Sequence, residues 1–192
     1  QVLASIFINV STEADLLQIG MLKVNPATAK FMLDHYVDLK PGDWVVQNAG
    51  NSAVGRYLIQ LAKAKGVHSI NIVRREGLEQ ELTEIGADLV LVEGEDLPEK
   101  VRAELGDANI PLAIDAVAGK ATISLGGILS EEGTVVNYGL LSGEPCQLTA
   151  DMVVFKGITL TGFWLAKTLG AMTAEAKQQL YGELESLVVS GK

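Results

Sequence analysis

The sequence is poor in the residues that build disulfide frameworks and metal sites. A single cysteine, Cys146, among 192 residues excludes an internal disulfide framework and a multi-cysteine zinc site within this chain. It has no base partner in the sequence, so we interpret it as inert. The two histidines, His35 and His68, have no metal-ligating neighbours and are interpreted as structural or solvated. A reducing compartment is therefore expected: the cytoplasm, or the mitochondrial matrix if the source is eukaryotic.

Two further features are lacking: an excess of positive charge and a long apolar run. Lys and Arg number 15 against 24 Asp and Glu, so the net charge is −9, and no basic stripe stands out. We therefore expect no nucleic acid and no anionic membrane as a partner. No apolar run approaches the roughly 18–20 residues that a helix needs to cross a bilayer.

The composition that is present favours a globular α/β protein. Hydrophobic residues make up 48% and glycines number 20, which is typical of a buried core with many tight turns. A length of 192 residues suggests one domain with a small appendage. Residues 1–10 predict a strand and residues 12–20 a short helix. Because the chain starts at Gln1 and ends at an expected helix terminus, we expect a fragment of a longer protein.

Strand-like and helix-like segments alternate after a Pro41-Gly42 break. The strands are continuous apolar runs, which is the pattern of strands buried on both faces of a parallel sheet. Six strands with helical connections predict the α/β doubly wound six-stranded parallel (Rossmann) fold, strand order 3-2-1-4-5-6. The expected strands are 43–48, 67–73, 88–92, 110–116, 133–138 and 157–163. The expected helices are 27–36, 53–65, 77–85, 97–105, 119–129, 150–155 and 174–189.

The turn after the first expected strand has the features of a phosphate site. In open parallel sheets a ligand binds where the strand order reverses, here between this turn and the segment 115–119. Small residues let the backbone approach a pyrophosphate, and the next helix offers its N-terminus, with Ser52 as a good N-cap. Only two glycines remain of the usual fingerprint, so a plain turn without a ligand is the alternative. The predicted cofactor-binding residues are Asn48, Ala49, Gly50, Asn51, Ser52, Ala53, Val54 and Gly55.

The second expected strand ends in Arg74 and Arg75. An acid at this place would hold the ribose hydroxyls of NAD, whereas guanidinium groups suit the 2′-phosphate of NADPH by charge and bidentate geometry. The pair favours NADPH over NADH and counts against a methyltransferase that uses S-adenosylmethionine. A solvated arginine pair near Glu76 is the alternative.

Five segments together resemble a known family: LKPGDWVVQNAGNSAVG, INIVRREG, IDAVAG, GTVVNYG and ITLTGFWL. They resemble the cofactor domain of the medium-chain dehydrogenase/reductase superfamily. The turn and the Gly-Phe-Trp-Leu strand are most similar to its zinc-independent, quinone oxidoreductase-like branch, in particular to the mitochondrial-type trans-2-enoyl thioester reductases. The resemblance extends from about Leu16 to Lys192.

The resemblance implies a role for each matching segment. The turn 48–55 would cradle the pyrophosphate, and Arg74, with help from Arg75, would hold the 2′-phosphate. The chain departs from these reductases at Glu76, where they carry a second basic residue. The residues implied to flank the ribose and nicotinamide are Ala118, Gly119, Tyr138 and Gly139, and those implied to close over the nicotinamide are Phe163, Trp164 and Leu165.

The resemblance also implies an organisation and an activity. Residues 1–22 would be the remnant of a missing β-rich catalytic domain, and residues 23–192 the NADPH-binding Rossmann domain. The protein would transfer hydride to the activated C=C bond of an enoyl thioester, or to a quinone, and would be a homodimer through its sixth strand. No metal is expected, because Val24 stands where zinc-dependent relatives carry a ligand, and no catalytic residue is assigned. A non-catalytic nucleotide-sensing or scaffolding domain is the alternative.

Overall fold

The computed structural model describes residues 23–189, with side chains for residues 23–187. The strand expected at 1–10 and the helix expected at 12–20 lie outside the described residues. Ala29–Phe163 form one compact unit, and the described residues 23–28 and 164–189 belong to a second. The domain boundary expected between residues 22 and 23 stays a prediction.

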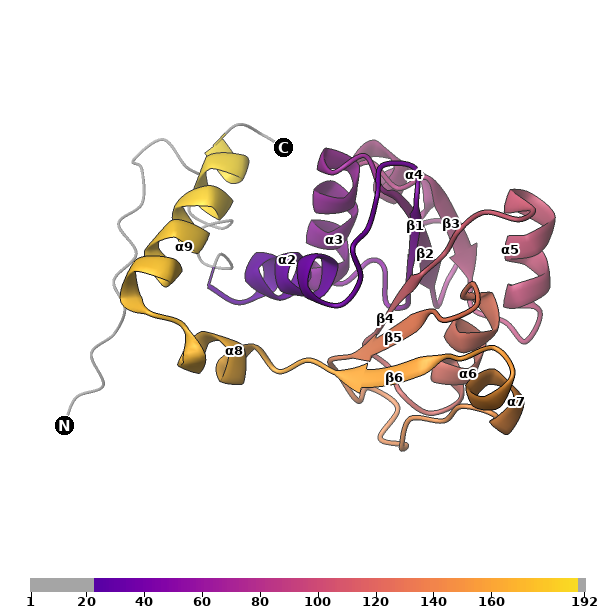
Figure 1. Ribbon diagram of the computed structural model, residues 1–192. Helices are drawn as coiled ribbons and strands as arrows, with labels where there is room; N and C mark the ends of the chain where they lie inside the picture. Colours follow the sequence, from indigo (N-terminus) through magenta and orange to yellow (C-terminus); the bar gives the residue numbers. More distant parts are fainter. Residues whose placement is uncertain (1–22, 190–192) are drawn as a thin grey trace. The chain divides into compact units, whose positions relative to one another are not determined.

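A six-stranded parallel sheet forms the centre of the larger unit (Figure 1). Its strand order is β3-β2-β1-β4-β5-β6, which confirms the predicted doubly wound fold. Each strand lies inside its predicted range. The bounds are β1 Trp44–Gln47, β2 His68–Val73, β3 Leu89–Val92, β4 Leu112–Asp115, β5 Thr134–Asn137 and β6 Thr159–Gly162.

The helices follow the predicted order, with one addition. That addition is α8 (Leu165–Ala171), whose sequence signal is weak because it is short, has no side-chain cap at Trp164 and contains Gly170. The other helices are α2 Asn25–His35, α3 Ala53–Ala64, α4 Glu79–Glu84, α5 Leu97–Leu105, α6 Lys120–Ile128, α7 Ala150–Val154 and α9 Ala174–Val189.

Helices bury the sheet on both faces, which explains why its strands are continuously apolar. Val45 and Val46 are neighbours in β1 but point to opposite faces, as the two-residue period of a strand requires. Val45 packs with Leu58 of α3 in the cluster that also includes α2. Val46 packs with Val101 of α5 and Leu125 of α6. Figure 1 shows α2 and α3 on one side of the sheet and α5 and α6 on the other.

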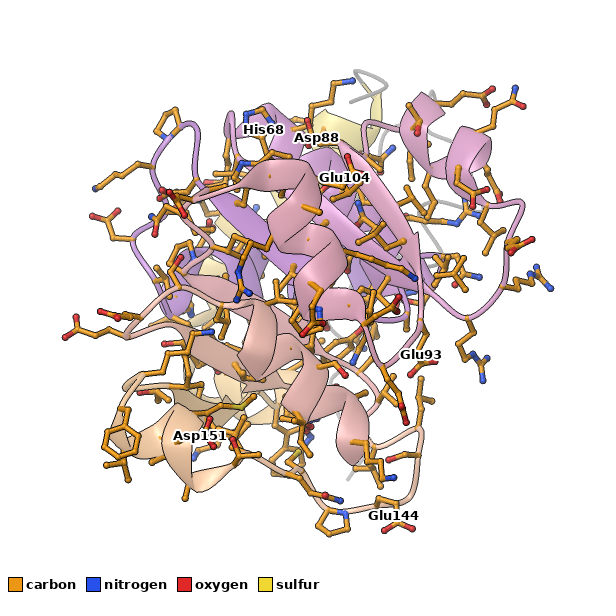
Figure 2. The ribbon with its side chains drawn as sticks, turned by 90° about the vertical axis from the view of Figure 1, so that its right-hand side faces the viewer. His68, Asp88, Glu93, Glu104, Glu144 and Asp151 are labelled. Atoms are coloured by element: carbon orange, nitrogen blue, oxygen red, sulfur yellow. The ribbon has the colours of Figure 1, made fainter. Side chains whose placement is uncertain are left out.

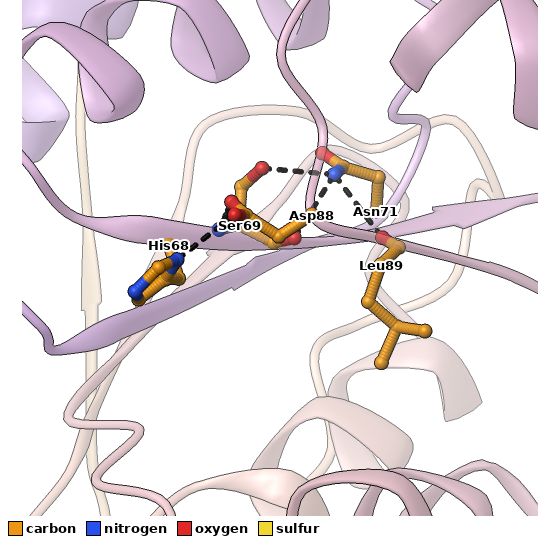
Figure 3. Close-up of polar contacts among 5 residues, drawn as sticks. All are labelled: His68, Ser69, Asn71, Asp88 and Leu89. Carbon is orange, nitrogen blue, oxygen red and sulfur yellow. Dashed lines mark hydrogen bonds and ion pairs between the residues drawn. The ribbon is translucent and has the colours of Figure 1, made fainter.

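His68, the first residue of β2, is held by contacts with neighbouring side chains. The Nδ1 atom of His68 lies 2.8 Å from Oδ1 of Asp88, whose Oδ2 accepts a 2.8 Å hydrogen bond from the Ser69 N–H (Figure 3). The His68 ring also stacks on Trp44, with 4.8 Å between centroids. These contacts agree with the interpretation of His68 as a structural residue. His35 likewise packs on a ring, that of Phe31 at 4.9 Å.

Across the described part of the chain, no helix is both long enough and apolar enough to cross a membrane.

Candidate nucleotide-binding site

A cavity of about 370 Å³ opens at the carboxyl ends of the strands in the larger unit. It lies where the strand order reverses between β1 and β4, as the sequence predicts. Segments that follow five strands contribute to its wall. The lining residues are Asn48, Ala49, Asn51, Ser52, Ile72, Val73, Arg74, Glu93, Val117, Leu141 and Ser142.

The turn between β1 and α3 has the cap geometry predicted for a phosphate site. The Oγ atom of Ser52 accepts a hydrogen bond of 3.1 Å from the Gly55 N–H, which makes Ser52 the N-cap of α3. The first turn of α3 contains no acidic residue, so nothing in it neutralises the positive end of the helix dipole. The remaining N–H groups of that turn are suited to an anion such as a pyrophosphate.

The two glycines of the turn are needed because the backbone is tightly packed there. A Cβ atom on Gly55 would lie 2.5 Å from the carbonyl oxygen of Gly50 and 2.9 Å from that of Ala49. A Cβ atom on Gly50 would lie 3.0 Å from the Cβ atom of Asn71. Ala49 itself has a φ of 50°, a left-handed conformation that costs energy in a non-glycine residue. The turn is therefore a strained structure that has no room for a side chain at Gly55.

A buried amide pair supports the turn from inside the sheet. The Gln47 Nε2 atom donates to the Gly55 carbonyl at 2.9 Å and to Oδ1 of Asn71 at 2.7 Å. Asn71 in turn donates to the Ser69 hydroxyl at 3.0 Å and to the Leu89 carbonyl at 3.2 Å (Figure 3). Sequence reasoning missed this pair. The available signal was an amide side chain next to aliphatic residues in each of two expected strands.

A buried hydrogen-bonded pair joins the ends of β1 and β4. The Asn48 Nδ2 atom donates to Oδ1 of Asp115 at 2.7 Å, and Asn48 Oδ1 accepts from the Ala116 N–H at 2.7 Å. Both side chains are buried. This pair holds the two walls of the crevice together. Sequence reasoning used Asp115 only to mark a strand end and missed its role.

The same carboxylate also fixes the loop that follows β4. Asp115 Oδ1 accepts 2.9 Å hydrogen bonds from the N–H groups of Val117 and Ala118, and Oδ2 accepts from the Thr122 hydroxyl at 2.7 Å. Ala118 has a φ of 66° and Gly119 a φ of 63°, so the loop adopts a left-handed path that these bonds maintain. Ala118 and Gly119 follow Val117 in the chain, but only Val117 of the three is among the residues that line the cavity.

The predicted residues at the end of β5 lie close to the same turn. Burial raises the pKa of Tyr138 above 10.0; the nearby Ser52 side chain opposes this shift, and the charge of Asp115 adds to it. A Cβ atom on Gly139 would lie 2.6 Å from the Ala116 carbonyl oxygen, so the chain has no room for a side chain there.

The arginine pair is exposed at the end of β2. Arg74 lines the cavity, and Arg75 is not among the lining residues. Within residues 23–187, neither guanidinium makes an ion pair or a hydrogen bond. An acidic residue missed by sequence reasoning, Glu93, lines the cavity beside Arg74.

The last predicted segment crosses the boundary between the two units. Phe163 ends the larger unit, donates its N–H to the Asn137 carbonyl at 2.8 Å and packs its ring against Phe31 at 6.2 Å. Trp164 and Leu165 belong to the other unit, where Trp164 is the N-cap of α8 and Leu165 is its first residue. The contact of these three residues with a nicotinamide stays a prediction.

Acidic, histidine and cysteine side chains do not gather into a metal site anywhere in the described part of the chain. Cys146 is a free, half-buried thiol. The prediction that no metal is bound remains a prediction.

Comparisons with known proteins agree with this geometry. The sequence model of the zinc-binding dehydrogenase family matches residues 53–181. A mitochondrial enoyl-[acyl-carrier-protein] reductase of Dictyostelium discoideum is 37% identical over 176 residues, covering 88% of this chain and 50% of that protein. The chain thus spans about half the length of the curated relatives it matches.

Two solved structures resemble the whole arrangement. Etr1p in complex with NADP and crotonyl-CoA has a TM-score of 0.85 and 31% identity, covering 92% of this chain and 51% of Etr1p. The mitochondrial 2-enoyl thioester reductase Etr1p/Etr2p heterodimer of Candida tropicalis gives the same TM-score, 0.85, with 31% identity over 92% of this chain and 51% of that one. The chain therefore belongs to the zinc-binding dehydrogenase family, and its relatives within the medium-chain dehydrogenase/reductase superfamily are enoyl thioester reductases.

Proposed function

We propose that this chain is the NADPH-binding part of a reductase that transfers hydride to the C=C bond of an enoyl thioester. The observation that carries the proposal is Arg74, whose guanidinium has no partner among residues 23–187 and lines the same cavity as the phosphate turn. A 2′-phosphate satisfies such a group bidentately, whereas the hydroxyl of NADH does not. Relatives that are enoyl reductases, and a similar structure with NADP and crotonyl-CoA, support the same cofactor and substrate class.

The residues of the chain bind and orient the cofactor in this account. The turn 48–55 and the N-terminus of α3 hold the pyrophosphate, with Ser52 as the cap. The Asn48–Asp115 pair keeps the crevice at a fixed width, because both side chains are buried and hydrogen-bonded. Tyr138 is protonated at neutral pH, and burial raises its pKa further, so its hydroxyl is a neutral neighbour of the phosphate turn. NADPH supplies the hydride when it is bound, and the protein positions it and excludes water.

The rest of the machinery is proposed to lie in a second domain. Residues 1–22 would belong to a β-rich catalytic domain, and the chain's span of about half its relatives supports a further part of that kind. No residue described here is assigned as the general acid. Because the relatives carry mitochondrial names, the mitochondrial matrix is the proposed location in a eukaryote, and the cytoplasm otherwise.

We propose a homodimer through the free edge of β6. This strand ends the sheet, so one side of its backbone has no partner strand among the described residues. Leu160 of β6 is exposed, and Phe155, just before the strand, is 84% exposed. The reported heterodimer of Etr1p and Etr2p supports assembly in this family. Light scattering tests the dimer. The unsubstituted protein should have twice the mass of one chain, and the Leu160→Asp variant should have the mass of one chain. A monomeric unsubstituted protein would refute the dimer.

Turnover measurements test the activity. The protein that contains this chain should consume NADPH in the presence of a crotonyl thioester and consume NADH much more slowly. Arg74→Ala should raise KM for NADPH with little change in kcat, because the 2′-phosphate is remote from the reacting carbon. NADPH binding without consumption of a thioester or a quinone would favour the non-catalytic sensor instead. NADPH consumption with quinones but not with thioesters would show that the substrate is a quinone.

A further inference from the structure

The cavity contains two opposite charges that make no ion pair with each other. Of the described residues that line it, Arg74 carries the single guanidinium and Glu93 the single carboxylate. Arg74 is accounted for by the 2′-phosphate. Glu93 is not, because a carboxylate beside a phosphate repels it. We propose that Glu93 accepts a hydrogen bond from the 6-amino group of the adenine of NADPH, and so selects adenine over other bases. The proposal rests on the proposed function.

Glu93 is held at a fixed place relative to the arginine. It is the first residue after β3 (Figure 2), and its N–H donates to the Val73 carbonyl at 2.8 Å. That bond extends the β2–β3 pairing, in which Val73 is opposite Val92, by one residue. Glu93 and Arg74 therefore leave the sheet side by side from neighbouring strands, and a ligand that reaches one passes the other.

The cavity walls between these charges suit the flat faces of a purine. Ile72 and Val73 of β2 line the cavity, together with Val117 and Leu141 from the loops after β4 and β5. Leu141 is 72% exposed, so it has apolar surface left to cover. Pockets for small ligands are usually lined by apolar side chains, with a few polar groups that bind the polar edge of the ligand.

Few groups in the adenosine half of NADPH can donate a hydrogen bond to Glu93. An ionised carboxylate only accepts hydrogen bonds. The phosphates and the ring nitrogens of adenine accept as well, whereas the 6-amino group donates two. Within residues 23–187 the Glu93 side chain has no hydrogen-bond or ion-pair partner, so it is available to a ligand. Ribose hydroxyls are the other donors, and the experiment separates them from the base.

The test replaces the 6-amino group by an oxo group, which also turns the neighbouring ring nitrogen N1 from an acceptor into a donor, and keeps the sugars and phosphates unchanged. The two probes are NADPH and its hypoxanthine analogue, nicotinamide hypoxanthine dinucleotide phosphate in reduced form, each titrated with the chain. Both carry the 2′-phosphate, so repulsion between Glu93 and phosphate cancels in the ratio of their Kd values. We expect the unsubstituted chain to prefer NADPH by roughly tenfold, the range of a hydrogen bond to a charged group.

Three variants complete the measurement. Glu93→Ala should bring the ratio close to one, and Glu93→Gln should do the same because its amide can turn to donate to the 6-oxo group. Glu95→Gln, an exposed neighbour outside the cavity lining, makes the same charge change and should keep the tenfold ratio. A ratio that Glu93 variants leave unchanged overturns this inference alone. A chain that binds no NADPH overturns the proposed function and this inference with it.

Discussion

The two ends of the nucleotide site are built in opposite ways. At the ends of β1 and β4, Asn48 and Asp115 are buried and every interaction between them is already made. At the ends of β2 and β3, Arg74 and Glu93 are exposed and, in the described structure, have no partners. The difference separates two tasks. In the proposed function, the first region sets the shape of the site for a dinucleotide, and the second leaves its charges free to recognise a particular one.

Removing the buried carboxylate should have the largest effect. Asp115→Ala leaves the Asn48 amide, two backbone N–H groups and the Thr122 hydroxyl without their acceptor. We expect a loss of about 3 kcal/mol in the free energy of unfolding, measured in urea. Glu104→Ala, on the exposed side of α5 (Figure 2), is the matched control and should change it by less than about 0.5 kcal/mol. Similar values for the two variants would mean that the buried region is not the stable one.

A methyl group at Gly55 should destabilise the turn between β1 and α3 by a steric clash. Gly55→Ala places a Cβ atom 2.5 Å from the Gly50 carbonyl oxygen, so the turn must shift. We expect about 2 kcal/mol of lost stability and a strong loss of NADPH affinity, measured by thermal unfolding and titration. Gly182→Ala in α9 has open space and should stabilise by about 0.5–1 kcal/mol instead. A Gly55→Ala chain that binds NADPH normally would refute the requirement for a glycine.

Three buried or half-buried tyrosines should make the stability of the chain sensitive to alkali. Burial raises the pKa of Tyr36, Tyr138 and Tyr181 above the ordinary 10.0. The folded chain therefore holds more protons than the unfolded chain above that pH, and the stability these groups contribute is lost as pH rises through their folded pKa values. Unfolding measured between pH 8 and about pH 11 should show a decline that Tyr138→Phe reduces. An identical decline in the variant would exclude Tyr138 as a contributor.

The sequence predicted the common part of the fold well, because that part follows from local pattern. Continuous apolar strands identified the parallel sheet, and Ser52 identified the N-cap of α3. Asp115 was missed because its importance comes from a hydrogen bond to Asn48, 67 residues away in the sequence. Glu93 was missed for a similar reason: only the pairing of β2 with β3 places it beside Arg74.

The two arginines also differ more in the structure than in the sequence. Both were predicted to serve the 2′-phosphate, but only Arg74 lines the cavity. Their exposure agrees with either a phosphate site or a solvated pair, so binding must decide between these interpretations.

The most direct measurement is a pair of titrations of this chain, with NADPH and with NADH, repeated on Arg74→Ala and Arg75→Ala. The account predicts that the unsubstituted chain prefers NADPH by about 10- to 100-fold, the range of charge-assisted bidentate contacts. Arg74→Ala should lose most of that preference while its affinity for NADH stays the same, and Arg75→Ala should lose less. Equal affinity for the two nucleotides in the unsubstituted chain, or no binding of either, would contradict the assignment of this site to NADPH.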